Sequence, residues 1–281
     1  MNVRHILTSL PLLALFSMGC APALSSMQPA HVAPKHHVQA EFGMDVSVPT
    51  GTLLDAIDAA DTLVKAAGER DLTDGEVQQV YKAAAATLLN PPSATPHVGV
   101  GFTVVDNLEI SLRYATSSLR LGSRYQFLNK AKHGIDASAG LGLGYFVLDL
   151  PLDAIPIIKL EDFSRFQVDV PIVFGTRGSW YRLWGGPRFM YTRFGTELKL
   201  EIEASSTVSA KTELASFSGN GFYVGGQAGV AVGYKYVFLA FEFTFVRLIM
   251  NGDLSVLQKP VEKFDLSSNI VYPSLGLMGE F

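Results

Sequence analysis

Apolar residues alternate with polar or small residues along most of the chain from His37 onward. Along Val237–Met250, every second position up to Phe245 is apolar, and Ala240, Glu242 and Thr244 stand between them. Because side chains alternate across a strand, this pattern predicts a strand with one apolar face and one polar or small face. We find ten such segments. They are approximately His37–Val48, His97–Asp106, Leu108–Ala115, Leu119–Leu128, Gly134–Leu150, Phe166–Thr176, Trp180–Phe194, Asn220–Lys235, Val237–Met250 and Asn269–Phe281.

The connections between these segments alternate between short and long. Tight turns are expected at 106–107, 129–133, 176–179 and 235–236, which is every second connection, and only the connection near 116–118 is short where a long one is expected. Outer-membrane barrels have short periplasmic turns, longer extracellular loops and an even number of strands. Strands of this length also suit a tilted membrane crossing, which needs about 9–11 residues.

Aromatic residues fall on the apolar face near both ends of the expected strands, as girdles at the two headgroup levels would require. The turn-side set is Phe127, Phe174, Tyr181, Tyr234 and Phe281, and the loop-side set is Tyr114, Tyr145, Phe166, Tyr191 and Phe222. The last segment alternates Leu275 and Leu277 with Gly276 and Met278 and ends in Phe281. It resembles the closing strand of Gram-negative outer-membrane β-barrel proteins, whose terminal Phe the insertion machinery reads. The resemblance covers about 37–281 and implies that Phe281 is the barrel-assembly signal.

The sequence therefore predicts an all-β membrane protein. We expect an antiparallel up-and-down transmembrane β-barrel of about ten strands, within a range of eight to twelve, with both termini periplasmic in the outer membrane of a Gram-negative bacterium. Even parity is the main reason to count His37–Val48 as a strand. A soluble sandwich or a lipocalin-like barrel is the alternative, since both also alternate.

The N-terminus has the features of an export signal. Arg4 and His5 precede the apolar stretch Ile6–Phe16, which is too short to span a bilayer. The stretch ends at Cys20, the only cysteine of the chain, in a setting that resembles the cleavage box of bacterial lipoproteins. We expect a signal peptide over 1–20, lipidation of Cys20 and a flexible tether rich in Ala, Pro and Ser over 21–36. Ordinary cleavage near Ala21–Ala23 is the alternative.

One stretch, 51–92, departs from period two. Leu53, Ile57 and Ala60 recur at helical spacing, and Thr73–Glu76 resembles a capping box before a second helix. We expect a helical hairpin inserted after the first strand on the extracellular side. Its apolar faces would cover each other, the barrel mouth or a partner, so that it acts as a surface lid or as a lumen plug.

Charged residues on the polar faces are expected to form a network in the lumen. Barrels of about eight strands are filled by their own side chains, and only much larger ones leave an aqueous channel. We therefore favour a salt-bridged interior over a selectivity lining, with pairing between the adjacent strands that carry Glu109 and Arg124. Inward glycines such as Gly142 and Gly229 would leave room for arginine side chains or for a plug. The expected network is Glu41, Asp45, Glu109, Arg113, Arg120, Arg124, Asp136, Asp169, Arg182, Arg188 and Glu242.

Composition and charge exclude some classes of function. Net charge is −4, charged residues make up 17% of the chain, and basic residues form no runs, so no nucleic-acid partner is expected. No residues suggest a catalytic, metal or cofactor site, and no cofactor is expected. The leading hypothesis is a non-enzymatic scaffold or surface protein, serving adhesion or anchoring an envelope-spanning motility or secretion assembly. It would act through the hairpin and the loops 151–165, 195–219 and 251–268. The alternatives are a narrow pore for small solutes and, third, a membrane-embedded hydrolase. The expected partners are outer-membrane lipid, the barrel-insertion machinery and other envelope proteins.

Overall fold

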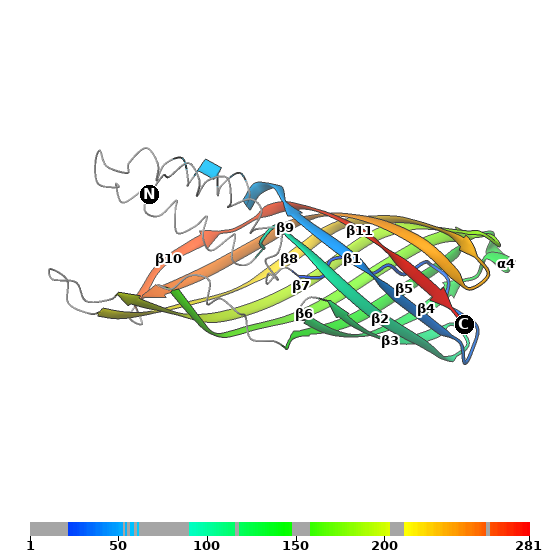
Figure 1. Cartoon of the computed structure of the whole chain (residues 1–281), viewed down its shortest axis with the longest axis horizontal. Coiled ribbons are helices and arrows are strands. Elements are labelled where there is room, and N and C mark those ends of the chain that lie inside the picture. The colour runs from blue at the N-terminus through cyan, green and yellow to red at the C-terminus, as the bar shows by residue number, and fades with distance from the viewer. Residues whose placement is uncertain are drawn as a thin grey trace, which may run out of the picture.

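A computed structural model shows a closed antiparallel barrel (Figure 1). It describes residues 22–52, 54, 57–58, 61, 90–115, 118–147, 158–202, 211–256 and 259–281. The strands are β1 (Val38–Pro49), β2 (Ser93–Val105), β3 (Leu108–Ala115), β4 (Ser118–Leu128), β5 (Asp136–Phe146), β6 (Ile158–Arg177), β7 (Tyr181–Ile202), β8 (Lys211–Tyr234), β9 (Val237–Val256), β10 (Lys259–Asp265) and β11 (Ser268–Glu280). The short helix α4 spans Lys130–His133.

Ten of the 11 strands form the ring. From β1 to β9, each strand pairs with the next strand in the sequence. Strand β11 completes the ring because it pairs with both β9 and β1. Among the described residues, strand β10 pairs only with the last part of β9, at Asn251–Val256. Strands β10 and β11 therefore pair with successive parts of the same edge of β9. This confirms the expected ten-stranded barrel and the inclusion of β1. Among the described residues, no helix is long and apolar enough to cross a membrane.

The two ends of the barrel differ in their connections. Tight connections at 106–107, 129–135, 178–180 and 235–236 lie at the same end as Phe281, and we call this the turn end. At Asn107 and Lys235 the backbone takes φ of 67° and 53°, the left-handed conformation that two-residue hairpins require. The opposite end, where β1 leads to β2 and β7 to β8, is called the loop end.

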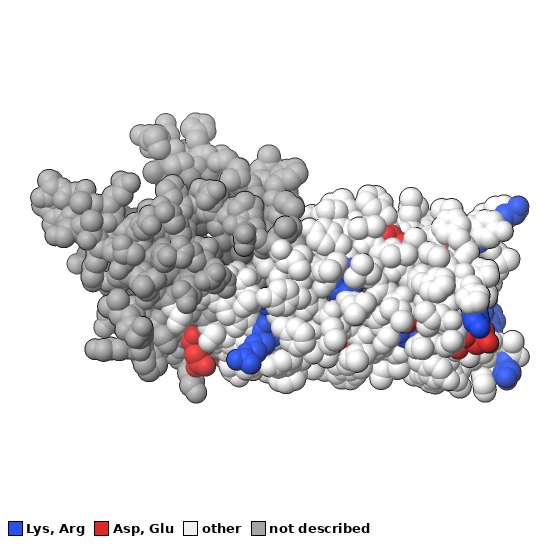
Figure 2. All heavy atoms as spheres, turned by 90° about the horizontal axis from the view of Figure 1, so that it is seen from below, with Lys and Arg blue, Asp and Glu red and all other residues white. Residues whose placement is uncertain are grey.

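The outer face of the barrel is apolar. On β9, Leu239, Phe241 and Phe243 are all more than 40% exposed, while Glu242 between them is fully buried. Across its middle, the described surface shows few charged side chains (Figure 2). Both expected girdles are present as contacts between aromatic rings of different strands. At the turn end Phe127 packs edge-on against Phe174, and nearer the loop end Tyr191 packs against Phe222. Such a band is what a lipid-facing barrel requires.

Strands β6 to β9 are much longer than the sequence predicted. The segments expected as loops at 195–219 and 251–268 are largely strand, because β7 runs to Ile202, β8 begins at Lys211 and β9 runs to Val256. The polarity of the faces reverses along this extension: Arg247, Asn251 and Asp253 face outward, while Leu248 and Met250 are fully buried inside. Beyond the membrane the outer face meets water, so apolar-out alternation no longer marks a strand there.

The N-terminal segment also differs from what the sequence predicted. Residues 21–36 were expected to form a flexible tether, but the described part from Leu24 to Ala33 is buried inside the barrel. Leu24 packs among residues of the loop-end half, including Phe194, Met250 and Leu266, whereas His36 hydrogen-bonds β2 at the turn end. The segment therefore runs from the loop-end half of the lumen to the turn end. The described chain starts in the loop-end half and finishes at Phe281 at the turn end, and the side of the membrane on which each terminus lies stays a prediction.

The helical insertion is described only at its edges. Helical residues begin at Thr50, directly after β1, and Leu54 and Ile57 are 62% and 56% exposed. Thr52 and Asn90, near the two ends of the insertion, are buried. The insertion thus leaves and re-enters the barrel at the loop end, as predicted. Its capping box at Thr73–Glu76 lies outside the described residues.

Candidate functional site

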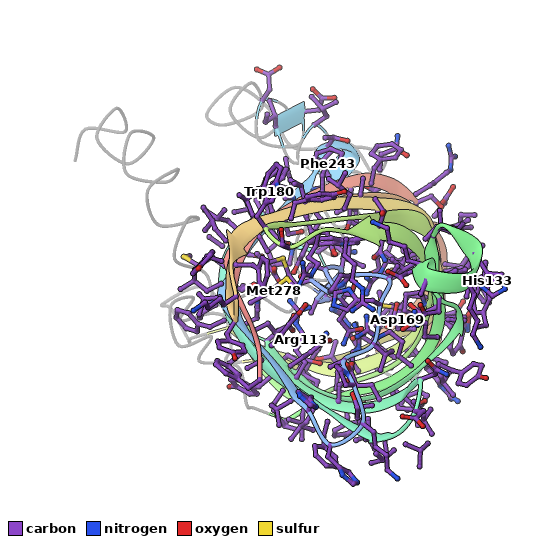
Figure 3. The ribbon with its side chains drawn as sticks, turned by 90° about the vertical axis from the view of Figure 1, so that its right-hand side faces the viewer. Arg113, His133, Asp169, Trp180, Phe243 and Met278 are labelled. Carbon is purple, nitrogen blue, oxygen red and sulfur yellow. The ribbon has the colours of Figure 1, made fainter. Side chains whose placement is uncertain are left out.

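The lumen of the barrel holds all 11 charged residues that the sequence assigned to it. Their side chains point inward from seven different strands, and Arg113 and Asp169 lie within the ring of strands while Phe243 points outward (Figure 3). Each of them has a partner within the lumen. Because buried ions are tolerated only when they are paired and hydrogen-bonded, this arrangement is the one that a closed interior requires.

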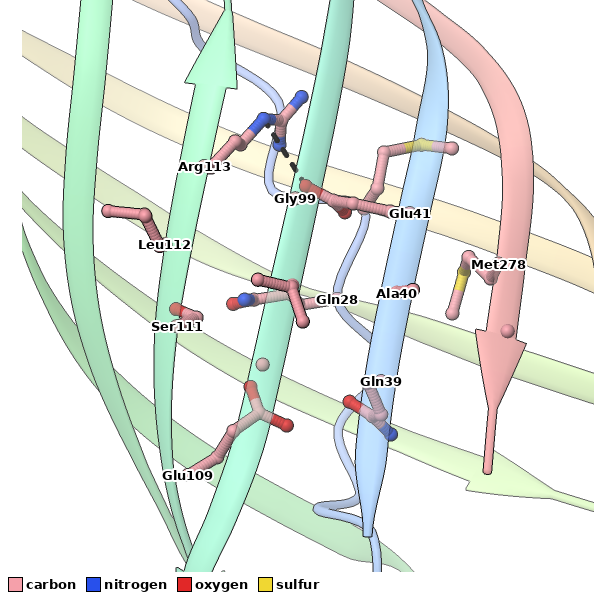
Figure 4. Close-up of a pocket in the computed structure, with 14 residues that line it drawn as sticks. Gln28, Gln39, Ala40, Glu41, Gly99, Glu109, Ser111, Leu112, Arg113 and Met278 are labelled. Carbon is pink, nitrogen blue, oxygen red and sulfur yellow. Dashed lines mark ion pairs between the residues drawn. The ribbon is translucent and has the colours of Figure 1, made fainter.

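Pairing across the β3–β4 hairpin occurs where it was expected. Arg124 donates a hydrogen bond of 2.9 Å to Glu109 on the neighbouring strand. Arg113, however, turns toward β1: its Nε lies 3.3 Å from Glu41 (Figure 4). Its Nη2 lies 3.1 Å from Asp45. Strand β2 pairs with both β1 and β3, and this places the acids of β1 within reach of an arginine two strands away.

The remaining charges form three further groups. Asp169 lies 3.0 Å from Arg120 and 3.1 Å from Arg188, and therefore bridges two arginines. Asp136 lies 3.4 Å from Arg177 and accepts a hydrogen bond from the main chain at Lys130. Arg182 binds a carboxylate that the sequence reading missed, Glu280, at 2.8 Å. The network therefore reaches from β1 around to β7 and back to the closing strand.

Glu242 differs from the other acids because its partners are not arginines. It is fully buried, and among described residues it accepts hydrogen bonds from the Ser26 N–H at 2.7 Å and from the Trp184 indole at 2.9 Å. The Ser26 hydroxyl lies 3.4 Å away. A buried carboxylate on the barrel wall therefore depends on the N-terminal segment for part of its stabilisation.

Inward glycines make room for the long side chains that fill the lumen. A Cβ at Gly142 would lie 2.8 Å from Nε of Arg120, and a Cβ at Gly229 would lie 2.2 Å from the ring of Trp184. The space that the sequence reading assigned to arginines or a plug is thus occupied by an arginine, a tryptophan and the N-terminal segment. Between that segment and β1–β3 remains a cavity of about 30 Å³, lined in part by Gln28, Glu41 and Glu109 (Figure 4). One water needs roughly 10–15 Å³, so the space admits about two.

Ser25, Asp45 and His97 meet in the lumen, but not as a hydrolytic triad. The Ser25 hydroxyl donates to Asp45 at 2.7 Å, and His97 Nδ1 lies 3.0 Å from the same carboxylate oxygen. In a serine hydrolase the histidine lies between the serine and the acid and takes the serine proton. Here the acid lies in the middle, so His97 cannot act as the base for Ser25. Among the described residues, no group of three His, Cys, Asp or Glu side chains could hold a metal ion.

Several residues of the lumen could not be identified from the sequence. Ser25, Ser26 and His31 lie in a segment whose composition is that of a linker. His97 was expected to begin a strand but lies within β2, and only the register of β1 against β2, which pairs Gly43 with His97, brings it beside Asp45. Glu280 was detectable, because it shares the inward phase of Met278, and the structure places it 2.8 Å from His31.

Phe281 closes the ring at the turn end. It exchanges two backbone hydrogen bonds with Val38, of 2.8 and 2.9 Å, and its exposed ring stacks on Tyr236. The last residue therefore both pairs with β1 and contributes to the turn-end girdle.

We expect removal of Phe281 to lower the yield of folded barrel in the membrane. The truncated chain loses both hydrogen bonds to Val38 and an aromatic contact worth about 0.5–1.5 kcal/mol. The measurement is the fraction of the protein that migrates as the folded, heat-modifiable form in membrane fractions. Phe281→Tyr keeps the ring and the backbone bonds and is the matched control. Equal folded fractions for the truncated and the unaltered chain would exclude Phe281 as an assembly signal.

Comparisons with known proteins find similarity to solved structures alone. No protein-family model and no curated protein matches the sequence. The outer membrane protease OmpT of Escherichia coli is similar over 91% of this chain and 100% of its own, with 8% identity and a TM-score of 0.40. Neisserial surface protein A matches 89% of this chain and 100% of its own, with 10% identity and a TM-score of 0.32. Ail of Yersinia pestis matches 88% and 99%, with 12% identity and a TM-score of 0.28. At these values the assignment to the transmembrane β-barrel class rests on the closed ring and its apolar belt.

Proposed function

We propose that this protein is a closed outer-membrane barrel of a Gram-negative bacterium that acts as a non-enzymatic scaffold or surface protein of the cell envelope. The observation that carries the proposal is the filled lumen. The N-terminal segment occupies the interior, its residues Ser25, Ser26 and Met27 are all buried to 1% exposure or less, and the wall charges are paired with one another or with the segment. A barrel built in this way holds shape and position rather than passing solutes.

The loop end is the part of the molecule available to a partner. Strands β6 to β9 have 20 to 24 residues, about twice the 9–11 that a tilted membrane strand needs. On the opposite wall β3, β4 and β5 have only 8 to 11 residues. The wall formed by β6 to β9, here called the raised wall, therefore extends well beyond β3 to β5 at the loop end. Polar residues such as Arg193 and Arg247 face outward on it. Together with the helical insertion, this raised wall offers a surface for another envelope protein, either in adhesion or in anchoring an envelope-spanning assembly.

Export and anchoring complete the proposal. We propose that residues 1–20 are a signal peptide and that Cys20 is lipidated; both lie outside the described residues. Insertion through the barrel-assembly machinery is supported by the position of Phe281 at the closing seam.

The experiment that tests the closed barrel is conductance of the purified full chain in planar lipid bilayers. We expect no discrete openings, because the described lumen is packed with paired charges and the N-terminal segment. Heat-modifiable migration of the same sample shows that the protein added is folded. Reproducible unitary openings of the folded protein would contradict the scaffold proposal and favour the narrow pore instead.

A further inference from the structure

The N-terminal segment has the hydrogen bonding of a bound peptide. Residues 22–33 form neither helix nor strand, and among described residues they make no backbone–backbone hydrogen bond. Buried backbone groups require partners. Side chains of the barrel wall supply them: Arg113 donates to the Ser25 carbonyl at 2.7 Å, Arg124 donates to the Pro29 carbonyl, and Gln126 accepts from the Val32 N–H at 2.8 Å. Glu242 accepts from the Ser26 N–H at 2.7 Å.

Apolar side chains of the segment are held at intervals of three residues. Leu24 packs in a cluster with Tyr223, Leu248 and Tyr272. Met27 and Ala30 pack in a second cluster, nearer the turn end, that includes Trp184 and Phe238. Met27 keeps this position although its φ is 48°, a conformation that a residue with a side chain rarely adopts. The contacts of the side chain therefore outweigh the cost of the backbone conformation.

The wall is shaped around these side chains. A Cβ at Gly276 would lie 3.1 Å from Cε of Met27, and a Cβ at Gly175 would lie 3.1 Å from Cβ of Ala30. The segment from Pro22 to Ala33 contains no Lys, Arg, Asp or Glu, although the surrounding wall is rich in charge. Wall charges thus pair among themselves, bind the peptide backbone, or bind the polar side chains of Ser25 and His31, while the apolar side chains of the peptide enter apolar pockets.

We propose that the lumen is a peptide-binding site and that residues 22–33 are its intramolecular ligand. The ligand class is an irregular, uncharged peptide with apolar side chains at every third position and free backbone groups between them. Binding depends on these contacts and not on the covalent link to β1. The link itself, 34–37, is exposed at the turn end, so the segment and the wall meet as ligand and receptor. A second chain that presents a segment of the same kind can occupy the site when the intramolecular ligand leaves.

The test separates the segment from the barrel after the full chain has folded. A recognition sequence for a site-specific protease is inserted between Lys35 and His36, both exposed, and the purified protein is cut in detergent. We expect the N-terminal fragment to remain with the barrel on gel filtration and to leave on heating. An excess of a fluorescent peptide spanning Pro22–Lys35 should then exchange into the cut barrel.

Competition between peptides tests the pockets. Met27→Gln places an amide in the apolar cluster and should weaken competition by about tenfold, because a buried amide without a hydrogen-bond partner is unfavourable. Gln28→Ala is the matched control, because Gln28 faces the cavity, and it should compete nearly as well as the unaltered peptide. Release of the fragment on cutting, failure of the labelled peptide to enter, or equal competition by the two variants would overturn the proposal. A conducting full chain would contradict the closed barrel without moving these readouts.

Discussion

An epitope inserted between Ala21 and Pro22 is expected to bind antibody on intact cells, whereas an epitope in the turn Lys130–His133 is expected to bind only after the outer membrane is opened. The reason is the direction of the N-terminal segment. It starts with Leu24 in the loop-end half and reaches the turn end at His36, so we expect the chain before Pro22 to leave on the loop side. An N-terminus held in the periplasm, as the sequence predicted, would give the opposite result.

Two controls make the topology experiment decisive. An epitope after Ser267, between β10 and β11 at the loop end, should be accessible on intact cells. If Ser267 is accessible and the N-terminal epitope is not, the segment does not thread the barrel. Cys20→Ser in the same chain should abolish incorporation of a lipid precursor while leaving the N-terminal epitope accessible, because the lumen contacts and not the lipid place the segment. Unchanged lipid labelling would exclude Cys20 as the modified residue.

Asp45→Ala is expected to lower the stability of the folded barrel by about 3–5 kcal/mol, the usual cost of removing one partner of a buried ion pair. Asp45 is fully buried and is contacted by four groups: Arg113 at 3.1 Å, Ser25 at 2.7 Å, His97 at 3.0 Å and Tyr272 at 3.2 Å. Its loss leaves Glu41 as the remaining described carboxylate beside Arg113 and removes one anchor of the N-terminal segment. The measurement is unfolding by urea in detergent, followed through heat-modifiable migration.

Asp253→Ala is the matched control for this substitution. Asp253 lies on the exposed outer face of β9, where a single surface charge contributes within about 0.5 kcal/mol. Asp45→Asn keeps the size and most of the hydrogen bonds and should fall between the two. Equal stability of Asp45→Ala and Asp253→Ala would show that Asp45 does not anchor the lumen network.

Much of the fold was predictable because the membrane imposes a simple rule on a strand. Lipid outside and a polar lumen inside force period-two alternation, so Leu239, Phe241 and Phe243 could be assigned to the outer face and Glu242 to the inner face from sequence alone. The same phase placed the lumen charges and the seam at Phe281. The rule fails beyond the membrane: on β9 the buried positions turn apolar from Val246, and Asn251 and Asp253 face outward, so the continuation of the strand past Met250 was taken for a loop.

The sequence by itself determined the class of the fold, the closed ring of ten strands and the inward position of the charges, because these follow from local alternation and from parity. The tertiary structure alone decided what fills the lumen and which charges meet. Pro22–Ala33 has the composition of a linker, and its burial comes from side chains on β3, β4, β8, β9 and β11 that are distant in sequence. Likewise Arg113 reaches Asp45 because β2 pairs with both β1 and β3, and Arg182 on β7 reaches Glu280 on β11 because β8 and β9 join these strands. Alternation states which face a residue occupies, whereas a partner across the lumen depends on the register and curvature of the whole barrel.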